Sequence, residues 1–206
     1  MCFNTNGAAY NRKKHRDLIG VVDLLSIHIE SLNEDLYNEL MAPLRLKNVL
    51  PKIDMLTEDF GDRVYVSSPV NRKNRGERDA ILAYFRDRGA STVFFAPLSN
   101  RCSPSQVYEE LAIAPQPGSC GSDILSDLIV DWTGEVFACC NDFSKELPLG
   151  SVSRQTVRDV FQDARRTSMA KALDAGAWGS LATCSKCAFD KAEGDVTFHL
   201  KEAETS

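Results

Sequence analysis

Apolar residues over the first hundred positions follow the alternation of buried strands and amphipathic helices. Residues 21–29 are apolar nearly throughout, which is typical of a strand buried in a parallel sheet. Residues 64–66 and 92–96 predict two more strands, whereas residues 48–56 and 76–88 place their apolar side chains on one helical face. Strands that alternate with helices indicate βαβ units, so the sequence predicts an α/β fold with a parallel sheet.

The ends of these elements carry their own signals. Ser31, three residues before Glu34, is typical of a capping box at the start of a helix. Pro51 suits the first turn of a helix that begins near Asn48, because the missing N–H is unpaired there anyway.

The pattern changes near residue 100. Residues 101–119 are rich in Pro and Gly and read as a loop. Residues 128–132 and 135–139 then predict a β-hairpin turned at Thr133-Gly134, and residues 156–175 predict one amphipathic helix. We therefore expect residues 1–100 as one domain, residues 101–190 as a smaller α+β domain, and residues 191–206 as a polar tail that frays.

Composition and charge narrow the kinds of protein that this sequence can encode. At 43% hydrophobic and 26% charged residues, the chain resembles ordinary globular proteins. Its net charge of −5 gives no basic footprint for nucleic acid. No run approaches the roughly 18 apolar residues of a membrane helix, and no signal peptide is evident, so we predict a cytoplasmic protein without membrane contact.

Four of the seven cysteines stand in a pattern that suggests a metal site. Cys184 and Cys187 form a CxxC pair, Cys120 precedes the hairpin, and Cys139 ends its second strand. In a reducing compartment such spacing favours ligands over disulfides. Four thiolates are soft donors, which select zinc, copper(I) or iron–sulfur clusters.

Other readings of the cysteines stay open. Buried free cysteine is the favoured interpretation of Cys2 and Cys102. Cys139 and Cys140 compete for one ligand position, since neighbours in a strand point to opposite faces and only one should face the metal. Spacing alone leaves zinc and iron–sulfur both possible, although splitting one pair across a hairpin is unlike a zinc ribbon.

The sequence also predicts roles for three further side chains close to these cysteines. Trp132 and Trp178 are expected to pack around the metal centre, where an apolar shell limits access of solvent. Asp142 is expected to cap backbone amides after the cysteine pair, in preference to contacting substrate.

The cysteine segment resembles the C-terminal auxiliary-cluster domain of radical SAM enzymes, of the SPASM/twitch type. Residues 131–136, the Cys139-Cys140-Asn141-Asp142 run and residues 149–152 before a helix and CxxC are typical of it. Because no cysteine follows Cys187, the shorter twitch form is the better match. That resemblance implies one auxiliary [4Fe–4S] cluster on Cys120, Cys139, Cys184 and Cys187.

The front half is similar to the later part of a radical SAM partial barrel, a half βα barrel. Residues 5–7, 26–29, 70–77 and 94–101 resemble its third to sixth strand regions. The resemblance implies that Ser26, Asn74 and Glu77 approach SAM.

The family's catalytic CxxxCxxC motif is missing from the sequence. We therefore expect an N-terminally truncated form that does not cleave SAM on its own and could use SAM only with the missing part. Residues 2–6 would then leave a strand edge, covered by that part or by a partner chain.

The predicted function is the iron–sulfur portion of a radical SAM protein, with the cluster as electron relay or substrate anchor. The resemblance implies peptide or sugar-like substrates. The alternatives are a non-catalytic partner of a separate radical-generating subunit and a structural zinc protein with four cysteine ligands. Enzymatic activity of this chain stays open.

Overall fold

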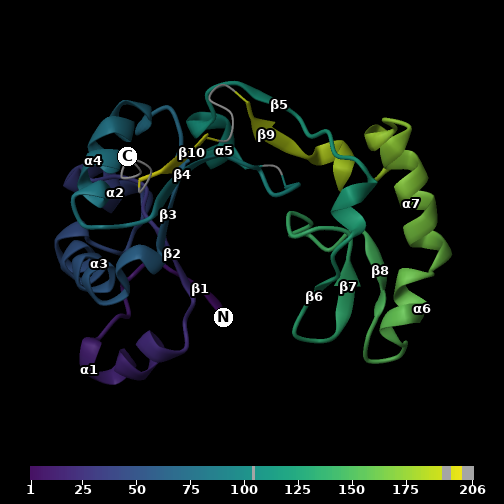
Figure 1. Ribbon diagram of the computed structural model, residues 1–206. Coiled ribbons are helices and arrows are strands. Elements are labelled where there is room, and N and C mark those ends of the chain that lie inside the picture. The colour runs from purple at the N-terminus through teal and green to yellow at the C-terminus, as the bar shows by residue number, and fades with distance from the viewer. Residues whose placement is uncertain (104, 192–195, 201–206) are drawn as a thin grey trace, which may run out of the picture. The chain divides into compact units, whose positions relative to one another are not determined.

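The computed structural model of the protein describes residues 1–103, 105–191 and 196–200. They form two compact units (Figure 1). The first unit comprises Met1–Pro97 with the C-terminal strand, and the second comprises Leu98–Ala192. The division between them falls close to the predicted boundary at residue 100.

A five-stranded sheet with the order β1-β2-β3-β4-β10 organises the first unit. Strands β1 to β4 run parallel to one another and β10 runs antiparallel to β4. This result confirms the predicted mixture of helices with a parallel sheet. The strand bounds are β1 Cys2–Thr5, β2 Leu24–His28, β3 Val64–Val70, β4 Thr92–Pro97 and β10 Val196–His199.

Helices of the first unit lie along one side of this sheet (Figure 1). They are α1 Arg12–His15, α2 Glu34–Leu40, α3 Leu46–Phe60 and α4 Arg78–Arg86, with 3₁₀ turns at Arg16–Gly20, Gly61–Arg63 and Arg75–Glu77. Along β3, buried residues alternate with half-buried ones, as expected when helices cover one face. Side chains such as Ile27, Ile53, Phe85 and Val93 are completely buried and form the core.

Two predicted helix starts in this unit are wrong. The first residue of α3 is Leu46 rather than Asn48, so Pro51 lies beyond its first turn. Asn33 rather than Ser31 caps α2, because the Asn33 side chain accepts the N–H of Leu36 at 3.0 Å.

The second unit contains two small antiparallel sheets. The larger has the order β6-β7-β8 and the smaller pairs β5 with β9. The strand bounds are β5 Pro115–Pro117, β6 Ile129–Val130, β7 Glu135–Phe137, β8 Pro148–Ser151 and β9 Ala188–Asp190. The helices are α5 Gln106–Leu111, α6 Val157–Phe161 and α7 Ala164–Asp174, with 3₁₀ turns at Ser122–Leu125, Trp178–Ser180 and Cys184–Lys186.

The predicted hairpin is present as β6 and β7. Asp131 shapes its turn by accepting the N–H groups of Thr133 at 2.8 Å and Glu135 at 3.2 Å. Gly134 adopts a φ of +87°, a backbone conformation that favours glycine. Behind the hairpin lies a small core of Leu125, Val136, Ala138, Leu149, Val160, Met169 and Leu173.

The single helix predicted over residues 156–175 is two helices. Thr156 and Asp159 form a capping box at the start of α6. Asp163 then accepts the N–H of Arg165 at 2.8 Å and caps a new helix, α7. A second N-cap within the periodic stretch therefore interrupts the helix.

The prediction of a fraying polar tail over residues 191–206 is wrong for Val196–His199, which forms β10. This strand pairs with β4, and the ring of Phe198 packs edge-on against Phe95 with centroids 5.9 Å apart. Residues 192–195 and 201–206 lie outside the described residues.

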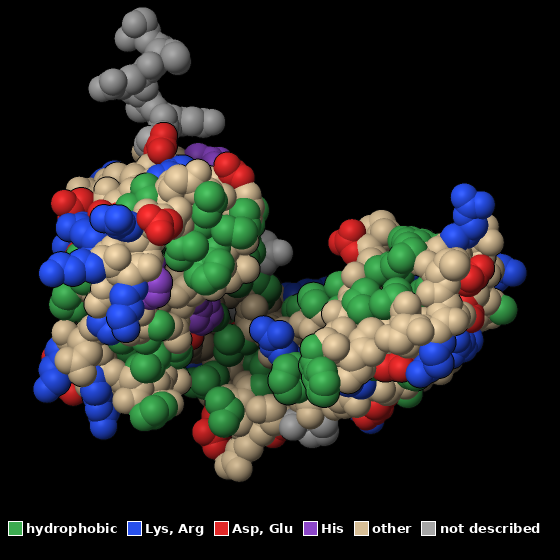
Figure 2. All heavy atoms as spheres, turned by 90° about the horizontal axis from the view of Figure 1, so that it is seen from below, with side chains coloured by type: hydrophobic (Ala, Val, Ile, Leu, Met, Phe, Trp, Pro, Cys, Tyr) green, Lys and Arg blue, Asp and Glu red, His purple; other side chains and the backbone are tan. Residues whose placement is uncertain are grey.

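No helix within the described ranges is long and apolar enough to cross a bilayer. On the face seen in Figure 2, Lys and Arg side chains are interspersed with Asp and Glu. The cytoplasmic location and the absence of a nucleic-acid partner stay predictions.

Candidate metal centre

The second unit contains a cavity of about 350 Å³ that all four predicted cysteines border. The complete set of lining residues is Cys102, Gly118, Cys120, Ile124, Asp127, Ile129, Cys139, Cys140, Asn141, Trp178, Cys184, Cys187 and Phe189. None of these lining residues is Lys or Arg. The structure thus brings Cys120, Cys139, Cys184 and Cys187 together, and their role as ligands stays a prediction.

The four cysteines share the lining of one cavity. Among the described residues, no group of three or more His, Cys, Asp or Glu side chains is placed so that it could hold one metal ion.

Cys139 is held in place by the central strand of the hairpin sheet. β7 ends at Phe137, and the Asp142 N–H donates to the Cys139 carbonyl oxygen at 3.1 Å. Because the strand has ended, the expected alternation between Cys139 and Cys140 does not apply. Cys140 is exposed and borders the same cavity as Cys139. Which of the two is the ligand stays a prediction.

The CxxC pair occupies one 3₁₀ turn that leads directly into β9. The Cys187 N–H donates to the Cys184 carbonyl oxygen at 3.2 Å. Pairing of β9 with β5 then brings the other cysteine-bearing segment alongside, and the Gly118 N–H donates to the Cys187 carbonyl oxygen at 2.8 Å. Trp178 fixes the Cys120 segment by donating its indole N–H to the Cys120 carbonyl oxygen at 2.8 Å.

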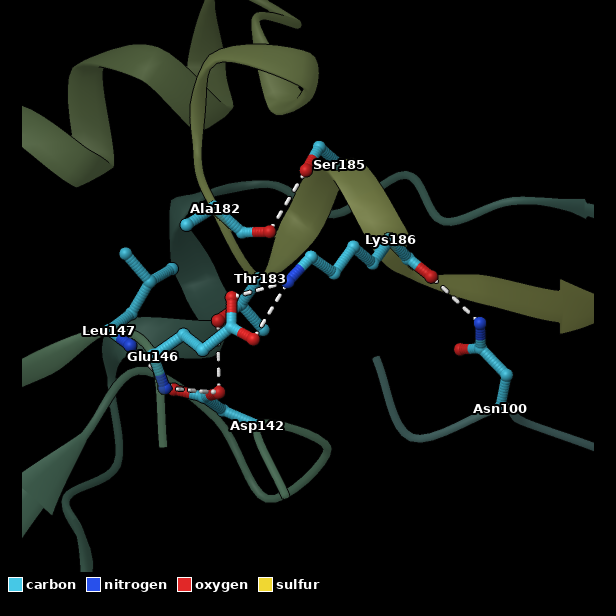
Figure 3. Close-up of polar contacts among 8 residues, drawn as sticks. All are labelled: Asn100, Asp142, Glu146, Leu147, Ala182, Thr183, Ser185 and Lys186. Atoms are coloured by element: carbon cyan, nitrogen blue, oxygen red, sulfur yellow. Dashed lines mark hydrogen bonds and ion pairs between the residues drawn. The ribbon is translucent and has the colours of Figure 1, made fainter. Parts of the chain in front are cut away.

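A polar network joins the loops that carry these cysteines (Figure 3). Asp142, three residues after Cys139, accepts the hydroxyl of Thr183, one residue before Cys184, at 2.9 Å. Its carboxylate also accepts the N–H groups of Glu146 at 3.0 Å and Leu147 at 2.9 Å. The prediction that Asp142 caps backbone amides is therefore confirmed.

An ion pair adds a second link between the same two loops. Lys186, inside the CxxC turn, lies 2.7 Å from the carboxylate of Glu146. On the opposite side of that turn, the Asn100 side chain donates to the Lys186 carbonyl oxygen at 2.7 Å (Figure 3). Several contacts remote in sequence thus fix the CxxC turn.

Burial dominates the electrostatics of the thiols. Burial, and then the sulfurs of Cys139, Cys187 and Cys120, raise the pKa of Cys184 to about 11. Burial likewise raises the pKa values of Cys120, Cys139 and Cys187. A metal must displace the protons of these thiols on binding, and its positive charge would stabilise the resulting thiolates.

Cys102 was missed as a member of this site. Its burial was predicted, and its exposed fraction is indeed only 2%. It nevertheless borders the cavity, and burial, followed by the charge of Cys187, raises its pKa well above the ordinary range. No sequence signal could have shown this position, because Cys102 has no regular spacing to the other four.

The two tryptophans differ from each other. Trp178 borders the cavity, as expected. Trp132 is 93% exposed, so its predicted packing around the metal centre is wrong. It lies between Asp131 and Thr133, in the hairpin turn, where no part of the small core reaches it.

Residues predicted to approach SAM lie in the first unit, and two of them have other partners. Asn74 donates to the carbonyl oxygens of Glu30 and Pro69, both at 2.7 Å. Glu77 accepts the hydroxyl of Ser31 at 2.8 Å and the N–H of Leu32 at 2.9 Å. Ser26 lies half-buried in β2. A SAM contact by these residues stays a prediction.

Comparison with known proteins supports this description of the cavity. Residues 120–188, which include all four predicted cysteines, match the SPASM family, an iron–sulfur cluster-binding domain. No protein with a curated description matches the sequence significantly.

Solved structures with a similar fold include two proteins. The structure of BtrN in complex with AdoMet and 2-DOIA is 18% identical with a TM-score of 0.50, covering 90% of this chain and 58% of BtrN. The structure of hexahistidine-tagged anSMEcpe with bound AdoMet is 12% identical with a TM-score of 0.57, covering 88% of this chain and 61% of the other. Native anSMEcpe with bound AdoMet gives the same identity and TM-score and is covered over 64% of its length.

Residues 120–188 match the model of the SPASM iron–sulfur cluster-binding domain, and the fold of the chain is similar to that of solved radical SAM enzymes. The resemblance found in the sequence is thereby confirmed. The chain spans 58–64% of the length of the solved structures that it matches.

Proposed function

We propose that the second unit holds one [4Fe–4S] cluster on Cys120, Cys139, Cys184 and Cys187. The observation that carries this proposal is that four thiols from three separate segments border one cavity within the matched domain. Thiolate is the donor that iron–sulfur clusters use. A structural zinc ion on the same four thiols is the alternative, and metal analysis distinguishes the two.

The surrounding residues would fix and shield the cluster. Ile124, Ile129, Trp178 and Phe189 give the cavity apolar walls that limit access of water. The Asp142–Thr183 hydrogen bond would hold the Cys139 and Cys184 loops at a constant separation. When bound, the cluster supplies one-electron transfer or an iron that anchors a substrate.

We further propose an auxiliary role in a radical SAM protein of the twitch type, whose first unit corresponds to part of a half barrel. The sequence holds no CxxxCxxC motif, so this chain alone should not cleave SAM. Peptide or sugar-like molecules are the proposed substrates. Use of SAM would require the catalytic part of such an enzyme.

The first sheet offers a place for that part or for a separate subunit. β1 pairs with β2 on one edge, and no other described strand pairs with its second edge. Phe3 in β1 and Leu24 in β2 are 43% and 37% exposed. A strand that added to this edge would pair its open backbone groups and cover the apolar side chains. This edge is the observation that favours the second candidate function, a cluster-binding partner of a radical-generating subunit.

Anaerobic reconstitution of the whole chain tests the cluster. We expect about four irons and four sulfides per chain, with no zinc and no SAM cleavage. Cys184→Ser and Cys187→Ser should each lose most of the iron, whereas Cys2→Ser and Cys102→Ser should keep it. Stoichiometric zinc with little iron would overturn the cluster proposal, and robust SAM cleavage would overturn the auxiliary role.

A further inference from the structure

The second unit has an open groove that is separate from the metal cavity. Residues of α7 and of the 3₁₀ turn Ser122–Leu125 line this groove, whose volume is about 500 Å³. Arg166 and Thr167 border it from α7, and Ser126 borders it just after the turn. None of its lining residues also lines the metal cavity.

Arg166 is the one positively charged side chain among the described residues that border the groove. Its exposed fraction is only 7%, and its Nη1 is buried with no hydrogen-bond partner in the described part of the chain. The nearby carboxylate of Asp163 is already paired with Arg165 at 2.9 Å. The Arg166 guanidinium lies over the ring of Phe161, 4.3 Å from its centroid, but this contact leaves the Nη1 hydrogens without an acceptor.

This position of Arg166 is unfavourable for a cation in two ways. Arginine keeps its charge in proteins, so burying it without a paired anion costs free energy. Burial accordingly lowers the pKa of Arg166. Arg166 also lies in the first turn of α7, where the helix dipole favours negative charge and disfavours positive charge. An anion bound beside Arg166 would offset both costs.

The other lining residues select the kind of anion. Asp123 borders the same groove and would repel a ligand with two negative charges more strongly than a ligand with one. Phosphate groups are commonly recognised by clusters of arginines, whereas this groove has one. A carboxylate carries a single charge and can accept two parallel N–H bonds from a guanidinium. Leu125, Phe161 and Ala170 add apolar walls, which suit a carbon chain attached to the carboxylate.

We propose that this groove binds a carboxylate attached to a short apolar chain, with Arg166 as its ionic partner and the Ser126 hydroxyl as a further donor. The carboxylate could belong to a free small acid or to the C-terminus of a peptide, since both present the same chemistry. Because the groove shares no residue with the metal cavity, this inference goes beyond the proposed function and does not rest on it.

Isothermal titration calorimetry on the full-length chain tests the proposal with butyrate as the probe. We expect butyrate to bind with a Kd on the order of 1 mM. Butyramide has nearly the same shape without the charge and should not bind measurably. Hydrogen exchange measured by mass spectrometry should then show that butyrate protects the groove segments, residues 122–126 and 164–170.

A peptide arm distinguishes the two sources of the carboxylate. The probe is an N-acetylated tripeptide that ends in leucine, compared with the same peptide amidated at its C-terminus. Tighter binding of the free-acid peptide than of butyrate would support the proposal with a peptide terminus as ligand. Equal or weaker binding of that peptide, with butyrate still bound, would support it with a free small acid as ligand.

Two substitutions of Arg166 and one control identify the residue that binds the anion. Arg166→Met keeps an apolar chain against Phe161 and removes the charge, so butyrate should bind about tenfold more weakly or worse. The variant should fold, because removing a buried unpaired charge is often neutral or stabilising. Arg166→Lys keeps the charge but loses the two parallel donors, so its affinity should lie between the two. Arg158→Met, at an exposed arginine of α6, should bind butyrate like the wild type.

Several results would overturn the proposal. One is equal binding of butyrate and butyramide by the wild type, and another is equal affinity of Arg166→Met and the wild type for butyrate. If Arg166→Met fails to fold, unchanged affinity in Arg166→Lys has the same meaning. Tighter binding of inorganic phosphate than of butyrate would overturn the assignment to a carboxylate. Butyrate protection confined to segments outside the groove would overturn the location.

Discussion

The residues predicted to bind a cofactor differ between the two units in whether they already have partners. In the first unit, Asn74 and Glu77 are fully engaged by backbone groups and by the Ser31 hydroxyl. In the second unit, the thiols of Cys120, Cys139 and Cys184 border a cavity of about 350 Å³. Asn74 and Glu77 thus have partners within the first unit, whereas the second unit gathers soft donors around a cavity.

The sources of stability differ accordingly. The first unit buries large side chains such as Phe85 and Phe95 between helices and sheet. The second has a core of seven buried residues and short strands. Small domains with few buried apolar residues commonly need a metal or disulfide. We infer that the cluster contributes to the stability of the second unit and contributes little to the first.

The largest expected effect comes from emptying the core of the first unit. Phe85→Ala should lower its free energy of unfolding by about 3–5 kcal/mol, since a completely buried ring leaves a cavity. Hydrogen exchange measured by mass spectrometry would show lost protection in residues 1–97. Iron per folded chain should stay constant.

Phe143→Ala is the control for this substitution, because Phe143 is 74% exposed. It should change stability by less than about 0.5 kcal/mol. A fall of iron content in Phe85→Ala, in step with the lost protection, would mean that the two units do not act independently.

A smaller effect is expected from crowding the Cys187 sulfur. Gly118→Ala would place a methyl group 2.6 Å from that sulfur and 3.1 Å from the Cys187 Cβ, so one of the two segments must move. The expected cost is about 1–3 kcal/mol, which is typical of overpacking. Loss of the cluster to an iron chelator, followed by absorbance, should accelerate by about tenfold for a cost near 1.4 kcal/mol.

Gly179→Ala is the matched control in the same unit, because nothing lies within 4 Å of its added methyl group. Its rate of cluster loss should equal that of the wild type. Equal rates for Gly118→Ala and the wild type would contradict the placement of Cys187 beside Gly118.

The smallest effect concerns the hydrogen bond between the two cysteine loops. Thr183→Val removes the donor to Asp142, while that carboxylate keeps the N–H groups of Glu146 and Leu147. We expect a loss of about 1 kcal/mol in the stability of the second unit, with full iron loading. Chemical denaturation followed by the absorbance of the cluster would measure it.

Thr167→Val, on the exposed side of α7, gives the comparison for Thr183→Val and should be nearly neutral. A neutral Thr183→Val would show that the Asp142–Thr183 contact does not hold the loops together.

Periodic patterns predicted most of the first unit. Residues 64–66 and 92–96 lie within β3 and β4, and the apolar run 21–29 contains β2. Predictions of helix starts from neighbouring residues were wrong where a residue distant in sequence binds the expected capping side chain. Ser31 looked like a helix cap, but it binds Glu77, which is 46 residues away. Short-range sequence rules contain no information about such a partner.

The candidate site was predictable in part. The two-residue spacing placed Cys184 and Cys187 in one turn, because turns fix local geometry. The approach of Cys139 and Cys120 to that pair followed from the resemblance to the SPASM/twitch type. The position of Cys102 beside the cavity depends on the Asn100 side chain, which accepts the N–H groups of Cys102 and Ala188, and on the pairing of β5 with β9. The exposure of Trp132 depends on the small size of the core in the second unit. Both features depend on contacts between segments distant in sequence, which the periodicity of apolar residues does not indicate.

The position of β10 has a consequence for synthesis. β4 and β10 are neighbours in one sheet, yet the chain between them contains the whole second unit. Within that unit, the Asp190 N–H donates to the Leu98 carbonyl oxygen at 2.8 Å, so its entry and exit lie together. A ribosome therefore releases the last strand of the first sheet only after every cysteine of the cavity has been made, and a short loop in place of the second unit should still let that sheet close.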